Sequence, residues 1–591
     1  MSDSTEVIPF GIVDYVVFSA MLAVSASTGI YHCFAGGGQK TTSRFLAADR
    51  KMPCAPIAMS MFVTVTSSAS ILGYPAEVYI YGVQYTLGVF AMLFSFPFAA
   101  YFIIPVIRGL PITSAFEYIG LRYNLSLRIT CAVIALLHML LTTAITMYAP
   151  ALAIAVVQDF EVWKMTAIIG SVTTFYTTLG GMKAVIWADV FQFFVIFGSV
   201  VAVAVLGTDE VGGIERVWNL NNVGDRLNFF NFSLDPTVRL TFLAIFVNTL
   251  ISSLYFGVGQ AVVQRHLASK STGHAQGSVL LNIPIQIMVR AFIFFNGLVL
   301  YAYYNNEQTS LIPAVNATFS PETPEKLLRG SNNPVRYEPN YSKSDQILMS
   351  FVSSQFGRIP GVQGLFVASL MAGSLSTISS SVNAVAASIL QDIVKPWRKW
   401  KSVQWKTRAV EKDDWDTTLS KIISCVFGVL ATLTGFLVPY FGSLVVITSI
   451  VVSVFSGPLT AVYILGMMLR RTNAWGTFCG LVAGCGIGLF IVAGPIVAVQ
   501  LDLEPLPIHK ISFMWYSSVI FFTTFIVGVV ASELFRFLKP SLIKEVDPLL
   551  LVVALRPKHR KIKSGGLIED FGKSMKATEV SVYGGLSDNV D

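Results

Sequence analysis

A short apolar segment between residues 373 and 383 carries the side chains with the clearest capacity for ion binding. At helical spacing, one face of this segment presents small, hydroxyl and amide side chains: Gly373, Ser376, Thr377, Ser380 and Asn383. The face offers several oxygen atoms and no charge of its own. Hard cations are held by oxygen ligands, and a weakly bound monovalent cation suits neutral ones. The pattern therefore predicts a sodium site on a membrane-embedded helix.

A second interpretation of the same face needs no ion. Small residues allow neighbouring helices to pack closely, and Ser and Thr hydroxyls bond back to carbonyls of their own helix. Both interpretations place the segment inside the protein, because polar groups without partners are very unfavourable in hydrocarbon. The density of hydroxyl groups between residues 373 and 383 favours the sodium site.

The composition places these residues in a membrane protein. The chain of 591 residues is 54% hydrophobic and only 13% charged, whereas about a quarter of the residues in a soluble domain are charged. The net charge of +7 comes from basic residues in short loops, so it reports topology and gives no reason to expect a nucleic-acid partner. There is no zinc-spaced His pair, P-loop or nucleophile elbow. We therefore expect no enzymatic activity, no catalytic residues, no cofactor and no metal other than sodium.

Apolar stretches predict an all-α polytopic membrane protein of about thirteen transmembrane helices. The predicted segments are 11–34, 54–80, 83–108, 128–158, 162–180, 184–207, 238–265, 276–304, 360–392, 418–440, 443–469, 475–499 and 511–537. They divide the chain into a transmembrane domain over 1–540 and a polar, largely disordered tail over 541–591. Within the domain we expect a leading helix at 11–34, core repeats at about 54–207 and 238–469, and trailing helices at 475–537.

Basic residues set the predicted orientation. Lys and Arg recur in alternate loops, from Lys40 and Arg44 to the cluster between Lys395 and Lys412, which predicts an extracellular N-terminus and a cytoplasmic tail. We expect a multi-pass protein of the plasma membrane. The glycosylation acceptors on the predicted outer side are Asn231, Asn316 and Asn340.

Two of the predicted helices contain breaking residues in mid-membrane. Segment 54–80 includes a Thr- and Ser-rich run followed by Gly73 and Pro75, and segment 238–265 includes Gly257-Val258-Gly259-Gln260. Such clusters unwind helices and free backbone carbonyls for ions. Without the first helix, these are segments one and six of a ten-helix set, where a five-plus-five inverted repeat has its discontinuous helices. Tightly packed but unbroken helices are the alternative.

Several motifs resemble those of the sodium/solute symporter family. The segment from Gly180 to Gln192, GGMKAVIWADVFQ, resembles the family signature, and further similarities run in order from about residue 12 to 500. The residues of these motifs are most similar to those of the sodium-dependent multivitamin and sodium-coupled monocarboxylate carriers, with the sodium–iodide carrier next. The resemblance implies a LeuT-like core of ten helices in two inverted repeats, with sodium and solute bound near the midplane.

The resemblance also implies a sodium ligand set. The side-chain hydroxyls of Ser376 and Thr377 would bind the ion, and the backbone carbonyls of Gly373, Val63 and Thr66 would complete the site. This set agrees with the hydroxyl face and the broken helix inferred from the residues themselves.

Four further residues match family positions associated with sodium. Asp189 and Gln192 would lie near the shared site, and Ser67 and Tyr148 match positions that hold a second sodium in the iodide and monocarboxylate carriers. An Asp in a membrane helix is a functional candidate by default. The alternative is that Asp189 is a carboxylate at the inner mouth that pairs with Lys183.

The substrate pocket departs from the family pattern. Ser70 replaces a Gln of the iodide and monocarboxylate carriers, and Gly259 replaces an Asn found in many members. Both residues, with Gln260, lie in the broken segments that shape the pocket, so the substrate stays open.

Arg290 is the least expected residue of the apolar segments. It lies in the middle of 276–304, where an arginine costs about 2.5 kcal/mol or more unless it is paired or hydrated. It either faces a water-filled cavity and binds a substrate carboxylate, or caps freed carbonyls or pairs with a carboxylate such as Asp189. We favour the structural role here, because this helix is expected to pack outside the two broken ones.

These inferences predict a symporter that imports a small organic anion together with sodium by alternating access. The anion would be a monocarboxylate or a vitamin carboxylate such as biotin or pantothenate, and the other partner is the lipid bilayer. One alternative is a carrier of iodide or another inorganic anion. Another is a non-transporting sensor or a sodium-leak channel on the same scaffold.

Overall fold

The computed structural model describes residues 8–34, 48–158, 160–316, 344–404, 413–501, 506–539 and 546–552, together with Glu504 and Leu555. Up to residue 223 the helices are α1 (Ile12–Phe34), α3 (Cys54–Val65), α4 (Ser68–Tyr81), α5 (Gly88–Phe98), α6 (Ile104–Gly109), α7 (Ala115–Arg122), α8 (Leu125–Gln158), α9 (Val162–Val211) and α10 (Ile214–Val223).

The remaining helices begin at residue 242. They are α11 (Phe242–Val258), α12 (Gln260–Ala268), α13 (Thr272–Asn316), α15 (Ile347–Phe356), α16 (Val362–Ser388), α17 (Lys395–Gln404), α18 (Asp413–Gly435), α19 (Leu444–Met468), α20 (Ala474–Gln500) and α21 (Tyr516–Leu538).

Short helical turns join several of these helices. The π-helical turns are η3 (Ala99–Ile103) and η5 (Ile389–Val394). The 3-10 turns are η1 (Ala48–Arg50), η2 (Val83–Leu87), η4 (Ser344–Gln346), η6 (Val438–Phe441), η7 (Pro507–Lys510), η8 (Phe513–Trp515) and η10 (Pro548–Leu550). Within the described residues the β-structure is one isolated bridge, between Met52 and Ser269. The predicted all-α class is confirmed.

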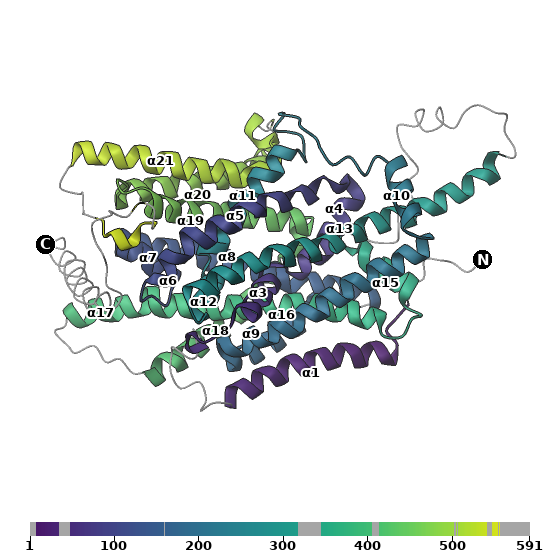
Figure 1. The fold of residues 1–591 in the computed structure, drawn as a ribbon, viewed down its shortest axis with the longest axis horizontal. Coiled ribbons are helices and arrows are strands. Elements are labelled where there is room, and N and C mark those ends of the chain that lie inside the picture. The colour runs from purple at the N-terminus through teal and green to yellow at the C-terminus, as the bar shows by residue number, and fades with distance from the viewer. Residues whose placement is uncertain are drawn as a thin grey trace.

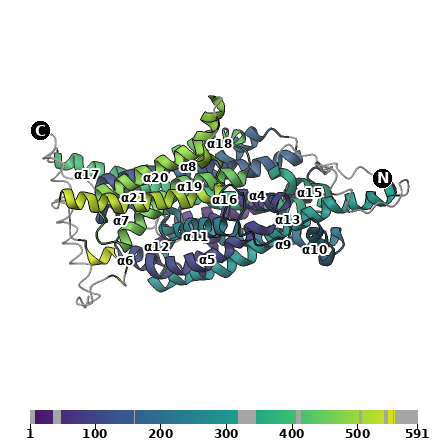
Figure 2. The same cartoon turned by 90° about the horizontal axis from the view of Figure 1, so that it is seen from above.

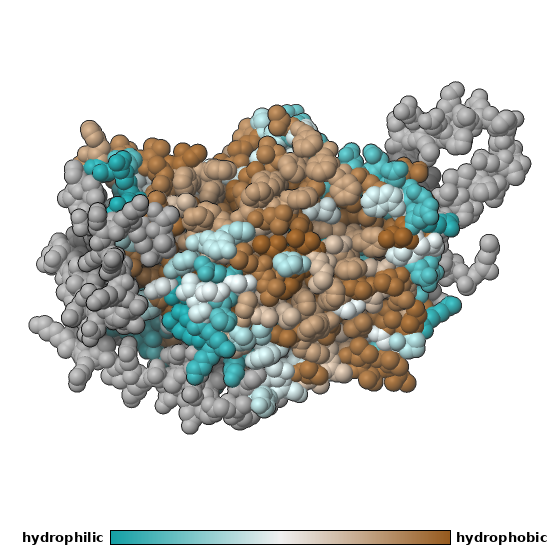
Figure 3. All heavy atoms as spheres, in the orientation of Figure 1, coloured by the Kyte–Doolittle hydropathy of each residue, from teal (hydrophilic) through white to brown (hydrophobic). Residues whose placement is uncertain are grey.

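Eleven of the thirteen predicted spans have a counterpart that is long and apolar enough to cross a membrane, within the described residues. In the described part of the chain, nine helices are long and apolar enough to cross a membrane, and two bent helix pairs raise the number to eleven. The two remaining predicted segments correspond to α1 and to the first part of α9. Figure 3 shows hydrophobic residues over most of the visible middle of the molecule, with hydrophilic residues gathered toward its ends. This distribution fits a protein whose waist is surrounded by lipid.

One predicted boundary is wrong. The sequence predicts separate segments at 162–180 and 184–207, but the backbone stays helical throughout α9. Gly180 and Gly181 lie within this continuous helix. Glycine costs only about 1 kcal/mol relative to alanine in a helix, so two glycines do not by themselves end one.

The two ends of the molecule differ in sequence character. Figures 1 and 2 both place α7 and α17 at one end and α10 and α15 at the opposite end. The first end carries the basic residues of the predicted inner loops, among them Arg122 and Lys395. There, Arg122 of α7 donates to the carbonyls of Gly466, Leu469 and Thr472, which fastens α7 to the end of α19.

Part of the predicted disordered tail is docked at this same end. Leu550, Leu551 and Val552 are buried. The Val552 amide donates to the Met467 carbonyl at 3.0 Å, and the Tyr118 hydroxyl donates to the Leu550 carbonyl at 3.1 Å. Residues 546–552 therefore belong to the packed end that carries α7 and α17, whereas residues 556–591 lie outside the described residues.

The helix α16 forms the centre of the core. In its span, Val362–Trp400, 94% of the most apolar window is buried, far more than in the outer span Phe513–Leu538 at 33%. Gly361 precedes α16 with a φ of +88°, a left-handed conformation that favours glycine. The carboxylate of Asp14 in α1 accepts from the amides of Gly361 and Gly364, and so fixes the start of α16. The predicted enclosure of the hydroxyl face is therefore correct.

Candidate sodium site and substrate pocket

The first predicted helix break is present. The helix α3 ends at Val65, α4 begins at Ser68, and the two axes are bent by 62°. Thr66 and Ser67 leave the helical conformation, and the backbone hydrogen bonds from residues 67 and 68 back to Val63 and Thr64 are not formed in this described segment. Carbonyl oxygens are thereby released in the middle of the protein, as the Thr- and Ser-rich run predicts.

The second predicted break is also present. The helix α11 ends at Val258 and α12 begins at Gln260, with a bend of 50°. Gly259 between them has no space for a side chain, because a Cβ there would lie 2.6 Å from the Tyr255 ring. The Gln260 side-chain oxygen accepts the Ala115 amide at 2.7 Å and ties the start of α12 to α7.

Two of the predicted sodium ligands on α16, Gly373 and Thr377, lie against α3 and the first break. Gly373 lies against the first break, since a Cβ on it would be 3.1 Å from the Ser68 nitrogen and 3.4 Å from the Thr66 carbonyl oxygen. The Thr377 hydroxyl is 3.1 Å from the Thr64 carbonyl and 3.0 Å from the Gly373 carbonyl. Val63, Thr66, Ser376 and Thr377 are all buried. The Thr377 hydroxyl thus meets the broken helix at Thr64, whereas the resemblance implied the neighbouring carbonyls of Val63 and Thr66.

The alternative interpretation of the hydroxyl face is correct for part of it. The Ser379 hydroxyl donates to the Ser376 carbonyl, and the Asn383 amide donates to the Ser379 carbonyl, within the same helix. Thr377 differs from these two because its hydroxyl also reaches a carbonyl of the broken helix α3. The face thus combines groups bonded to their own backbone with groups directed at the break.

Asp189 has an arginine partner that the sequence did not predict. Its carboxylate lies 2.9 Å from the Arg265 guanidinium, and the two side chains are only 1% and 0% exposed. The same guanidinium donates to the hydroxyls of Ser60 and Ser380 at 2.7 and 2.6 Å. The expected pairing of Asp189 with Lys183 or with Arg290 is wrong. Arg265 is the last residue of the predicted span 238–265, a position typical of a loop-flanking charge, but α12 carries it into the core.

This ion pair adjoins the predicted sodium ligands. The Thr64 hydroxyl lies 3.2 Å from the Ser380 hydroxyl, which accepts a hydrogen bond from the Arg265 guanidinium. Side chains of α3, α9, α12 and α16 therefore form one buried polar network. Its opposite charges compensate each other, which a low-dielectric interior requires.

Two sodium-associated candidates lie apart from the pocket. Gln192 is buried, and its side-chain amide lies 3.4 Å from the Ser25 hydroxyl of α1. Tyr148 is buried in the hydrophobic core of α8 and does not border the pocket described next. Ser67, by contrast, caps α4 and borders the pocket.

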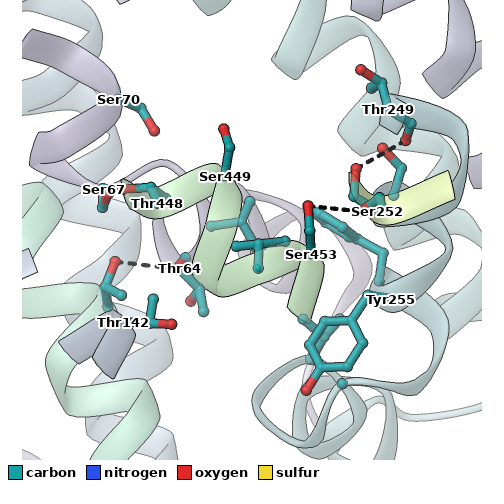
Figure 4. A pocket seen from close by; sticks show the side chains of 18 of the residues that line it. Thr64, Ser67, Ser70, Thr142, Thr249, Ser252, Tyr255, Thr448, Ser449 and Ser453 are labelled. Atoms are coloured by element: carbon teal, nitrogen blue, oxygen red, sulfur yellow. Dashed lines mark hydrogen bonds between the residues drawn. The ribbon is translucent and has the colours of Figure 1, made fainter. Parts of the chain in front are cut away.

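A cavity of about 280 Å³ lies between the two helix breaks. Figure 4 shows hydroxyl-bearing side chains of α3, α4, α8, α11 and α19 around it. The predicted pocket residues that line it are Ser70, Gly259, Gln260 and Arg290, together with Ser67 and the predicted sodium ligand Thr377. The cavity and the predicted sodium ligands thus share a wall.

The sequence missed most of the hydroxyl groups in this pocket. Thr448, Ser449 and Ser453 come from α19, and Thr249 and Ser252 come from α11. A signal was present, because Ser and Thr recur in the apolar run from Thr448 to Thr460 without any charge. Ser and Thr on a helix face are compatible with a cavity wall, but they are equally common where two helices pack together. The sequence pattern alone therefore does not distinguish the two.

The three glycosylation candidates lie in different parts of the chain, and the structure describes two of them. Asn231 lies in the connection before α11, where its side-chain oxygen accepts the Ser233 amide and its nitrogen donates to the Leu240 carbonyl. Asn316 is the last residue of α13. Asn340 lies outside the described residues.

Comparison with known proteins extends the resemblance noted in the sequence. The model of the sodium:solute symporter family matches residues 45–484. The human sodium-coupled monocarboxylate transporter 1 is 34% identical over 501 residues, which cover 85% of this chain and 76% of the relative. A putative sodium-dependent multivitamin transporter of Drosophila melanogaster is 32% identical over 556 residues, covering 89% of this chain and 87% of the relative.

One solved structure has the same fold. A Na⁺-coupled sialic acid symporter in a substrate-bound outward-open state gives a TM-score of 0.71 at 22% identity, covering 89% of this chain and 98% of that one. Its similarity agrees with the predicted five-plus-five core, in which α3/α4 and α11/α12 are the first helices of the two repeats.

Proposed function

This chain belongs to the sodium:solute symporter family and is a sodium-coupled membrane transporter, and from that premise we propose that it imports a small organic anion. The anion is a monocarboxylate or a vitamin carboxylate such as biotin or pantothenate. The observation that carries this proposal is the position of Thr377, which borders the cavity while its hydroxyl reaches the Thr64 carbonyl of the broken helix.

Sodium binds, in this proposal, to the hydroxyls of Ser376 and Thr377 and to the carbonyls of Gly373, Val63 and Thr66. Two contacts at the first break support the assignment: the Thr377 hydroxyl reaches α3, and Gly373 approaches the Thr66 carbonyl. Oxygen atoms are the ligands of hard cations. Asp189 and Gln192 belong to the surroundings of the ion. A second sodium at Ser67 and Tyr148 stays a prediction, and of these two residues only Ser67 borders the cavity.

The shared wall gives coupling a physical basis. An ion that holds α16 against α3 fixes the side of the cavity that the solute contacts, so each ligand favours the conformation that binds the other. The membrane potential adds to the driving force. At −60 mV, each net positive charge that moves inward contributes about 1.4 kcal/mol.

Uptake measurements test this function directly. Cells that express the protein should accumulate labelled lactate, biotin or pantothenate in sodium medium and not in choline medium. Uptake of iodide alone would indicate a carrier of inorganic anions. Under voltage clamp, a sodium current that flows without any solute and does not change when solute is added would indicate a leak channel. The absence of both uptake and current would indicate a sensor.

Glycosylation tests the proposed orientation, in which the α10 and α15 end faces the outside of the plasma membrane and the α7 and α17 end faces the cytoplasm. Asn316 and Asn340 both lie in the part of the chain before α15 that is proposed to face the outside, so both can carry a glycan. A double Asn316→Gln/Asn340→Gln variant should therefore migrate at lower apparent mass. Its position should match that of the enzymatically deglycosylated wild type if Asn231 is unmodified. An identical band for wild type and double variant, with or without glycosidase, would contradict the prediction. Asn124→Gln, in a predicted inner loop, is the control and should cause no shift.

A further inference from the structure

We propose that Arg290 of α13 binds the carboxylate group of the imported solute and selects anions over neutral molecules of the same shape. This inference rests on the proposed function, because it places the solute in the cavity between the helix breaks. Arg290 is half-buried and borders that cavity.

The cavity has one fixed charge. Among the described residues that line it, Arg290 is the only Arg, Lys, Asp or Glu, and the other polar lining groups are mainly hydroxyls and amides. An isolated cation beside neutral hydroxyls favours an anionic ligand, since a buried charge needs a counter-charge.

The nearby carboxylates already have other partners. Glu77 of α4 binds Arg239 through two hydrogen bonds of 2.9 and 3.1 Å, and Asp189 binds Arg265. Within the described chain no ion pair involves Arg290. The Arg290 charge is therefore not neutralised within the described chain and is available to a bound anion.

The Arg290 guanidinium is held through its Nε, which leaves the edge with its two terminal nitrogens available to a ligand. Its Nε donates to the Gln286 side-chain oxygen at 2.9 Å, one helical turn earlier in α13. Its plane lies over the Tyr74 ring at 5.7 Å. The two terminal nitrogens make no hydrogen bond to other described residues, and a carboxylate can bind such a pair through two parallel hydrogen bonds.

The structure also removes the reason for assigning Arg290 a purely structural role. The helix α13 does not pack outside the broken helices, because the Asn282 amide donates to the Ala58 carbonyl of α3 at 2.7 Å. Further along α13, Gly297 approaches α4 so closely that a Cβ would lie 2.7 Å from the Pro75 carbonyl. Arg290, between these two contacts, is therefore on the side of α13 that faces the first break and its cavity.

The test compares acids with their uncharged amides. For lactate with lactamide and biotin with biotinamide, the ratio of uptake efficiencies (Vmax/KM) is measured for the wild type and for Arg290→Gln. Because both efficiencies in a ratio are measured on the same variant, differences between variants in the amount of protein at the cell surface cancel. Arg290→Gln should lower the acid-to-amide ratio by a factor of about 10 to 100, the usual range for losing a charged hydrogen bond. Arg290→Lys should keep the preference for the acid, with a higher KM.

Two further variants sharpen the result. Gln286→Glu places a carboxylate beside the Arg290 Nε and should compete with the solute, raising KM for the acid. Arg226→Gln is the matched control, because Arg226 stacks on Tyr301 and donates to the Ile80 carbonyl outside the cavity. It should leave the acid-to-amide ratio unchanged.

An unchanged ratio in Arg290→Gln would overturn the proposal. If the wild type imports none of lactate, biotin and pantothenate with sodium, the proposed function is wrong, and Arg290 is then tested on purified protein by thermal unfolding with each acid and its amide. The acid should raise the unfolding temperature of the wild type more than its amide does, and Arg290→Gln should lose that difference. Equal effects of acid and amide on the wild type would show that Arg290 does not bind carboxylates.

Discussion

Replacing either Ser376 or Thr377 by alanine should raise the sodium concentration for half-maximal uptake by a factor of about 10 to 100. Each hydroxyl is a proposed ligand of the ion, and an interaction with a charged group contributes about 1.5–3 kcal/mol, or one to two factors of ten in affinity. The Thr377 hydroxyl has the better-defined geometry, at 3.1 Å from the Thr64 carbonyl and 3.0 Å from the Gly373 carbonyl. Uptake is measured against sodium concentration at saturating solute.

The matched control is Ser379→Ala. Ser379 is buried in the same helix, but its hydroxyl donates to the Ser376 carbonyl of its own backbone. It should change the sodium dependence little, and all three variants should reach the cell surface. Thr377→Ser keeps the hydroxyl and should retain most of the sodium affinity. Equal sodium half-saturation in the wild type and both alanine variants would refute the assignment of these ligands.

Breaking the ion pair between Asp189 and Arg265 should strongly destabilise the protein. Arg265→Leu leaves a buried carboxylate without its counter-charge, and removing one partner of a buried pair costs about 3–5 kcal/mol. We expect a large loss of surface protein and a lower unfolding temperature in detergent. The double variant Asp189→Leu/Arg265→Leu should recover part of that loss, because no uncompensated charge remains.

An exposed ion pair is the control for this prediction. Lys164 and Glu161 lie 3.2 Å apart with side chains 46% and 60% exposed, so Lys164→Leu should change stability by less than about 1 kcal/mol. If Arg265→Leu were as stable as the wild type, the pair would not compensate buried charge. If the double variant were less stable than both single variants, the cost would come from lost packing instead.

The broken helices and the hydroxyl face could be predicted because their causes are local. Glycine and hydroxyl residues within a few positions of each other weaken a helix wherever it is placed, and both breaks occur in the predicted segments. The face with Gly373, Ser376 and Thr377 follows from helical periodicity alone. Local sequence thus determined which helices bend and which side of α16 is polar.

The partners of the charged residues depended on the tertiary structure. Asp189 and Arg265 are separated by 76 positions in the chain, and Arg265 lies at the end of a predicted span, where charge usually marks a loop. Only the bend between α11 and α12 directs that end into the core, so the alternatives open to Asp189 in the sequence, Lys183 and Arg290, did not include its actual partner.

Tertiary packing also decides which side chains line the pocket. A sequence shows that Arg290 lies in mid-helix, but the direction of its side chain depends on how α13 packs against α3 and α4. The hydroxyls of α19, including Ser449 and Ser453, border the cavity only because α19 lies across from the first break. The sequence by itself determined the membrane fold, the helix breaks and the oxygen-rich face of α16. The tertiary structure decided which polar groups meet, because those contacts join residues whose separation along the chain carries no information about their distance in space.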